Sequence, residues 1–126
     1  MKFTMDPKKV IVSGIIMLLL DFVYLTTFSN FYNNLIKSIQ GEKIKFNIVG
    51  ALFAYLFLIY GINYFILNQS KTTLTDAFIL GVIIYGVYET TNYAIIKKWS
   101  PYAIVLDTVW GGILYTLVTY FTRKLI

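Results

Sequence analysis

Three acidic side chains lie inside long apolar segments of this sequence: Asp21, Glu89 and Asp107. On insertion scales an Asp near the centre of a membrane-spanning helix costs about 2.5 to 3.5 kcal/mol, and such residues almost always face the interior of a helix bundle. In that position a carboxyl group binds a proton, a cation or a polar ligand, or it hydrogen-bonds one helix to another. The residues alone leave both interpretations open.

Polar and aromatic residues share a helical face with each acid, because positions three or four apart are neighbours on a helix. Tyr24 follows Asp21 by three positions, and Trp110 follows Asp107 by three. Tyr85, Tyr88 and Asn92 lie on the same face as Glu89. The candidates for a polar site are therefore Asp21, Glu89, Asp107, Asn92, Tyr24, Tyr88 and Trp110.

The chain has no Cys and no His. This composition excludes disulfides, Cys/His zinc sites, His-ligated haem, Cys nucleophiles and Ser-His triads. Paired carboxylates could still perform acid/base chemistry, alone or with a divalent metal, so an enzyme stays a third hypothesis, although the sequence favours a protein that is not an enzyme. We expect no cofactor, and the residues do not decide whether a metal binds.

The positions that could do this chemistry must be held by membrane helices, since 58% of the residues are hydrophobic and only 13% are charged. Apolar segments of spanning length cover residues 10–27, 46–67, 77–96 and 102–121. Thr75 with Asp76, and Ser100 with Pro101, supply helix-start chemistry before the last two. The sequence predicts one all-α membrane domain over residues 1–126, a bundle of four transmembrane helices.

A shorter amphipathic segment covers residues 30–40, where Phe31, Leu35 and Ile39 share one face and Asn34 and Lys37 lie opposite. This pattern predicts a short interfacial helix after the first span. The alternative is that the segment extends the first span into the headgroups.

Short loops make neighbouring spans antiparallel, so all three acids fall in the same half of the membrane, on the side of the first and third loops. The bundle can therefore bring them together. Gly50 and Ala54 have a spacing that permits close approach of two helices. Gly111 and Gly112 indicate a packing notch.

Basic residues are divided almost evenly between the two sides of the predicted bundle. Six lie with the termini and the second loop, and five lie in the first and third loops, so the positive-inside rule weakly favours cytoplasmic termini. We expect the lipid bilayer of a cellular or virion membrane as the main partner, a homo-oligomer if the protein transports a solute, and no nucleic acid. The bases flank apolar segments, which is typical of anchoring at a membrane surface.

Three motifs resemble a known family. They are Leu20-Asp21 with Tyr24, Tyr88-Glu89-Thr90-Thr91-Asn92 with Trp99, and Val105 with Asp107, Trp110 and Gly111. In this order they are similar to the pattern of the predicted membrane proteins designated DUF2177, over nearly the whole chain. Tyr24 replaces a usual Trp, and Glu89 replaces a usual Asp. The resemblance implies four spans and no particular activity, because the family has none assigned.

Two functions follow from these observations. In the first, the intramembrane carboxylates bind or translocate a proton, a cation or a small polar or lipid ligand. In the second, the protein is a structural or accessory component of a virion membrane or of a lipid-modifying complex, and the acids serve as hydrogen-bond links between helices.

Overall fold

The computed structural model of the chain describes residues 5–126, and helices are the only regular elements in that range. In chain order they are α1 (Pro7–Thr27), α2 (Ser29–Gln40), α3 (Ile48–Ile62), the π-helical turn η1 (Asn63–Leu67), α4 (Leu74–Ile95) and α5 (Pro101–Leu125). Four stretches are long and apolar enough to cross a membrane: α1, α3 with η1, α4, and α5. The predicted all-α fold class and four-helix bundle are confirmed.

Helices α1 and α4 begin a few residues before their apolar segments, because residues at their N-termini cap the free backbone N–H groups. Asp6 caps α1 through its side chain and Pro7 occupies the first turn, where the missing N–H of proline has no consequence. In α4 the prediction that Thr75 helps to start the helix was wrong. Thr73 is the N-cap: its hydroxyl accepts a hydrogen bond from the Asp76 N–H, and the Asp76 carboxylate accepts one from the Thr73 N–H, which forms a capping box.

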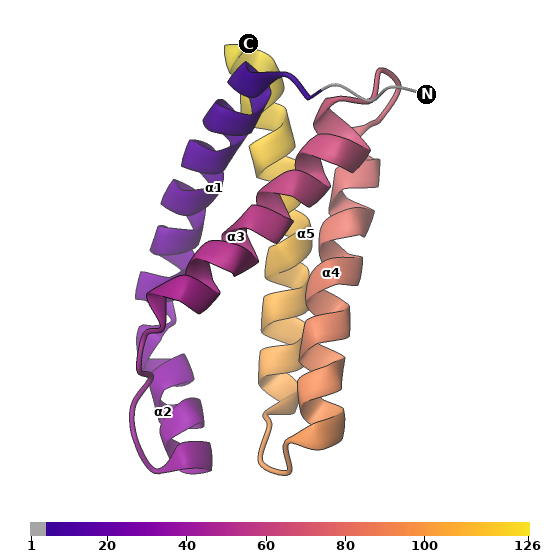
Figure 1. Cartoon of the computed structure of the whole chain (residues 1–126). Coiled ribbons are helices and arrows are strands. Elements are labelled where there is room, and N and C mark those ends of the chain that lie inside the picture. Colours follow the sequence, from indigo (N-terminus) through magenta and orange to yellow (C-terminus); the bar gives the residue numbers. More distant parts are fainter. Residues whose placement is uncertain (1–4) are drawn as a thin grey trace.

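Helices α4 and α5 lie antiparallel and in close contact along their lengths (Figure 1). Glycines make this contact possible, because a Cβ on Gly81 would overlap the carbonyl group of Gly111 and a Cβ on Gly112 would lie 2.6 Å from the Phe78 ring. Gly111 and Gly112 therefore form the packing notch that the sequence indicated. Close approach at Gly50 was a wrong expectation, since a Cβ there would meet only the side chain of its own cap, Asn47.

The apolar core fills the half of the bundle that holds the start of α1 and the end of α5 (Figure 1). Met17, Ile62, Leu114 and Val118 are fully buried there. Helix α3 crosses α1, α4 and α5 diagonally and reaches this core only with its second half (Figure 1). The first half of α3 lies outside this core, and on that side a space is left between α1 and the α4–α5 pair, lined by Asp21, Glu89 and Asp107 among others.

Helix α2 bounds that space at the other end of the bundle. It is separate from α1, with the break at Phe28, and it ends at Gly41, whose φ of 82° is in the left-handed region that glycine adopts easily. Leu35 is buried against Trp99, at the turn between α4 and α5, and against Ala103, near the start of α5. That α2 lies in the membrane interface remains a prediction.

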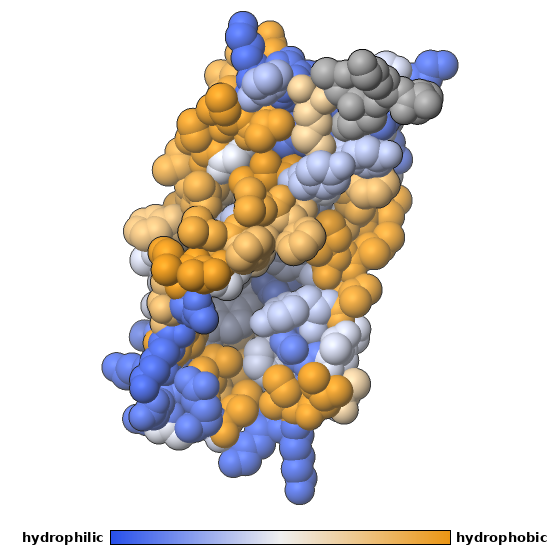
Figure 2. Space-filling view, in the orientation of Figure 1, coloured by the Kyte–Doolittle hydropathy of each residue, from blue (hydrophilic) through white to orange (hydrophobic). Residues whose placement is uncertain are grey.

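The outer surface between the two ends is dominated by apolar side chains, and polar ones gather at both ends (Figure 2). Leu19, Phe22 and Phe57 are 64%, 70% and 75% exposed. Side chains of this kind suit contact with lipid tails. On the face shown, the surface is hollowed below α3, and paler, more polar residues line the hollow (Figure 2).

Candidate functional site

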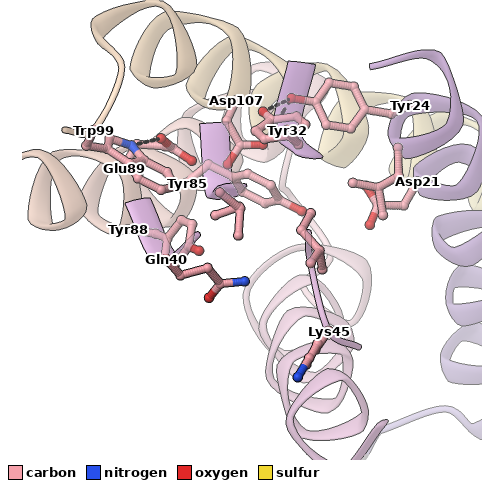
Figure 3. Close-up of a pocket in the computed structure, with 13 residues that line it drawn as sticks. Asp21, Tyr24, Tyr32, Gln40, Lys45, Tyr85, Tyr88, Glu89, Trp99 and Asp107 are labelled. Carbon is pink, nitrogen blue, oxygen red and sulfur yellow. Dashed lines mark hydrogen bonds between the residues drawn. The ribbon is translucent and has the colours of Figure 1, made fainter. Parts of the chain in front are cut away.

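The hollow leads to a cavity of about 420 Å³ that all three intramembrane acids line. Asp21 comes from α1, Glu89 from α4 and Asp107 from α5, and Figure 3 shows Asp107 between Glu89 and Asp21. The three residues are 7%, 1% and 8% exposed. Glu89 and Asp21 both lie close enough to Asp107 to interact electrostatically with its carboxyl group, Glu89 more strongly.

Asp21 is held by donors from two other helices. The Tyr55 hydroxyl of α3 donates to its Oδ2, and the Trp110 indole Nε1 of α5 donates to its Oδ1 at 3.0 Å. Both carboxylate oxygens of Asp21 therefore accept a hydrogen bond. This arrangement ties α1 to α3 and α5 at the level of the cavity.

Asp107 is linked to α1 and α2 through tyrosines. The Tyr24 hydroxyl donates to Asp107 Oδ1 at 3.3 Å and lies 2.5 Å from the Tyr32 hydroxyl of α2. The Tyr24 ring also stacks on Trp110, with centroids 4.6 Å apart. Burial raises the pKa of Tyr32 above its ordinary value, so this phenol stays protonated at neutral pH.

Glu89 has a different environment from the two aspartates. Its Oε1 accepts a hydrogen bond of 2.8 Å from the Trp99 indole Nε1, and Trp99 is fixed by its own burial at the α4–α5 turn. Its Oε2 is buried and takes no N–H or amide donor from the described part of the chain, while the Asp107 carboxyl group lies within hydrogen-bonding reach of Glu89.

Among the described residues that line the cavity, one is basic: Lys45, at its rim. Its ammonium group pairs with Glu42 at 3.0 Å, and both side chains are largely exposed to the outside. Over residues 5–126 no Lys or Arg forms an ion pair with Asp21, Glu89 or Asp107. The inner wall is therefore acidic without a basic counterpart.

The sequence profile of the family described as "Predicted membrane protein (DUF2177)" matches residues 8–123. The chain belongs to this family. The same comparisons find no match among curated proteins or among solved structures. Membership agrees with the resemblance that the three motifs carry, and the acids of these DUF2177 motifs are the ones that meet at the cavity.

The candidate residues taken from the sequence fall into three groups. Asp21, Glu89, Asp107, Tyr24 and Tyr88 line the cavity. Trp110 stands behind Asp21 and Tyr24, where it donates to one and stacks on the other. Asn92 lies outside the lining and is half-buried.

Several lining or supporting residues were absent from that set: Tyr32, Gln40, Lys45, Tyr55, Tyr85 and Trp99. Tyr85 precedes Glu89 by four positions, and Trp99 belongs to the same family motif, so the sequence contained a signal for these two. Tyr55 has no such signal, because it is one aromatic residue in a continuous apolar span. Gln40 lies at the end of α2 and Lys45 in the loop between α2 and α3, so the path of the chain in this region brings both to the cavity.

The geometry does not favour a single bound metal ion. Among the described residues no group of three or more His, Cys, Asp or Glu side chains is placed to hold one. A cavity of about 420 Å³ falls within the size range of small-molecule sites.

Proposed function

We propose that this DUF2177 protein binds a positively charged group of a ligand in the cavity, with Asp21, Glu89 and Asp107 as the source of negative charge. The observation that carries the proposal is the cavity itself, which is lined by three buried acids from three helices, none of them in an ion pair with a Lys or Arg of residues 5–126. A ligand cation in the cavity would compensate their charge.

The charge balance of the cavity supports a cationic ligand. Moving ionised carboxylates out of water is unfavourable unless they are paired, and intramembrane acids normally have an opposing charge or a proton. The three acids here receive hydrogen bonds from aromatic side chains, which stay neutral. A bound cation would supply the opposing charge.

The packing of the other half of the bundle favours binding over translocation. Met17, Ile62 and Leu114 are fully buried in an apolar core between the cavity and the end that holds the termini. A cation crossing this core would lose its polar partners. We therefore propose a binding site that is reached from the half of the membrane in which the acids lie.

The position of the opening indicates where the ligand enters. The hollow lies on the side of the bundle, below the diagonal α3 and above α2 and the α4–α5 turn (Figures 1 and 2). Leu25, Ile44 and Tyr88, which are about half exposed, belong to the lining there. Such a mouth would admit a group from the bilayer side near the headgroup level.

A second candidate function is structural, and the hydrogen bonds of the aspartates favour it. The bonds from Tyr55 and Trp110 to Asp21, and from Tyr24 to Asp107, each join two different helices. Links of this kind stabilise membrane bundles without any ligand. They do not account for Glu89, whose Oε1 takes its hydrogen bond from Trp99, only ten residues along the chain.

Thermal stability of the detergent-solubilised protein separates the two functions. A ligand that binds only the folded state raises stability by RT ln(1 + [L]/Kd), so a bound cation should raise Tm in a saturable way. We would compare inorganic and organic cations on the wild type and on Glu89→Gln, which keeps the size of the side chain and removes its charge. The proposal requires at least one cation to stabilise the wild type more than the variant. Equal shifts for both proteins with every cation would overturn it and leave the structural function.

A further inference from the structure

The walls of the cavity are unusually rich in aromatic side chains. Tyr24, Tyr32, Tyr85, Tyr88 and Trp99 all line it beside the three acids. The face of an aromatic ring attracts a cation through its quadrupole, and carboxylates strengthen that attraction when they lie nearby. Aromatic walls with acidic groups are the recurring solution for quaternary ammonium ligands.

The hydrogen bonds of the acids restrict the chemistry of the cation further. Four of the six carboxylate oxygens already accept a bond from the protein: both of Asp21, Oε1 of Glu89 and Oδ1 of Asp107. An inorganic ion needs several oxygen ligands, and a primary ammonium group brings three N–H donors that need acceptors. A cation without N–H donors needs only charge and contact surface, which this cavity provides.

Resting on the function proposed above, we infer that the bound group is a methylated ammonium, such as the trimethylammonium of a choline headgroup or of a free amine. Its bulk agrees with a cavity of about 420 Å³, which is far larger than one metal ion requires. The carboxylates of Asp21, Glu89 and Asp107 supply the charge, and the aromatic walls supply the contact. Lys45 at the rim offers a positive group to the phosphate of a lipid ligand.

Tyr88 allows the aromatic contribution to be tested without disturbing the fold. It lines the cavity but is 58% exposed, and the acids take their recorded hydrogen bonds from other side chains. Tyr88→Phe keeps the ring, whereas Tyr88→Leu removes it and keeps an apolar side chain. The matched control is Tyr93→Leu on the same helix, since Tyr93 is 55% exposed and lies outside the cavity lining.

Isothermal titration calorimetry on the full chain in a maltoside detergent, which has no ammonium group, provides the measurement. The probes are tetramethylammonium, choline, methylammonium and sodium as free cations. Mixed micelles with phosphatidylcholine, phosphatidylethanolamine or phosphatidylglycerol are the lipid probes. Tighter binding of choline than of the phosphatidylcholine micelles identifies a free amine, and the reverse identifies a lipid headgroup; both agree with the inference.

We expect tetramethylammonium to bind more tightly than methylammonium or sodium. Tyr88→Leu should weaken that binding by about two- to fivefold, the value for an exposed cation–π contact, while Tyr88→Phe and Tyr93→Leu match the wild type. If methylammonium or sodium binds as tightly as tetramethylammonium, or if Tyr88→Leu has no effect, the inference is wrong and the proposed cation site stands. If no cation binds, or if Glu89→Gln binds equally well, the proposed function itself fails.

Discussion

The indole Nε1 of Trp99 donates to Oε1 of Glu89 at 2.8 Å, while the second oxygen of the same carboxyl group takes no N–H or amide donor from the described part of the chain. Trp99 lies outside the membrane-spanning helices, at the turn between α4 and α5, and Glu89 is the most deeply buried of the three acids. The loop therefore fixes one oxygen of Glu89, a residue of the cavity wall.

Replacing Trp99 with Phe should destabilise the fold, because it leaves Glu89 Oε1 without its donor. The expected loss is about 1 to 3 kcal/mol in the free energy of unfolding, measured by denaturant titration in detergent. In the Glu89→Gln background the loss should be smaller, since a neutral acceptor is less costly to leave unpaired than a charged one. Equal losses in the two backgrounds would show that Trp99 acts only through packing.

Tyr55→Phe removes the hydroxyl that α3 donates to Asp21 and leaves the ring in place. We expect a loss of about 1 to 3 kcal/mol, for the same reason as above. The matched control is Tyr60→Phe on the same helix, because Tyr60 is 56% exposed and keeps its ring stacking on Tyr64. A Tyr55 variant as stable as the Tyr60 variant would argue against the link between α1 and α3.

Gly81→Ala should disrupt the contact between α4 and α5, since the added Cβ would overlap the backbone of Gly111. Overpacking of this kind costs about 1 to 3 kcal/mol. Gly86→Ala on the same helix is the control, because its Cβ would stand 3.5 Å from Thr108 Cγ2, an ordinary van der Waals distance. Comparable stability of both variants would mean that the helices are not in this close contact.

The arrangement of the spans can be tested by labelling single cysteines, since the natural chain has none. Lys8→Cys and Lys124→Cys lie at one end of the bundle, and Lys97→Cys lies at the α4–α5 turn at the other end. A membrane-impermeant thiol reagent applied to one side of sealed vesicles should label the first two together and the third only from the opposite side. Labelling of Lys8→Cys and Lys124→Cys from different sides would contradict a four-span protein.

Cation binding should weaken as the pH falls, because protonation removes the negative charge of the carboxylates. The cation prefers the ionised cavity, so binding at acidic pH must displace protons and the apparent Kd rises. Burial raises the pKa of Tyr32, so this phenol stays neutral and the profile below about pH 10 reports on other groups. Calorimetry across this range should give a smaller pH dependence for Glu89→Gln, and identical profiles would contradict a role for Glu89.

Much of this architecture follows from sequence patterns that act over short distances. Apolar length alone predicts the four spans, and the position of each acid along its span places Asp21, Glu89 and Asp107 in one half of the membrane. The helix-start residue of α4 was misplaced because both Thr73 and Thr75 have side chains that can cap a helix, and only the reciprocal bonds with Asp76 decide between them.

Contacts between distant segments could not be predicted from periodicity. Tyr55 reaches Asp21 because α3 crosses the bundle diagonally, and a continuous apolar span gives no indication of crossing angle. Lys45 reaches the rim because the chain between α2 and α3 runs back along the cavity. The close approach at Gly81 depends on which residue of the partner helix lies opposite it. The spacing of Gly50 and Ala54 was misleading because no partner helix lies as close to Gly50.

Tryptophan fluorescence provides the most direct test of the cation site, because both tryptophans of the chain donate to its acids: Trp99 to Glu89 and Trp110 to Asp21. Titrating the detergent-solubilised wild type with tetramethylammonium should change the emission in a saturable way, and Glu89→Gln should need a higher concentration or show no saturation. Coincident curves for the two proteins, or no saturable change in the wild type, would contradict a cation site at Glu89 and identify the acids as structural links between helices.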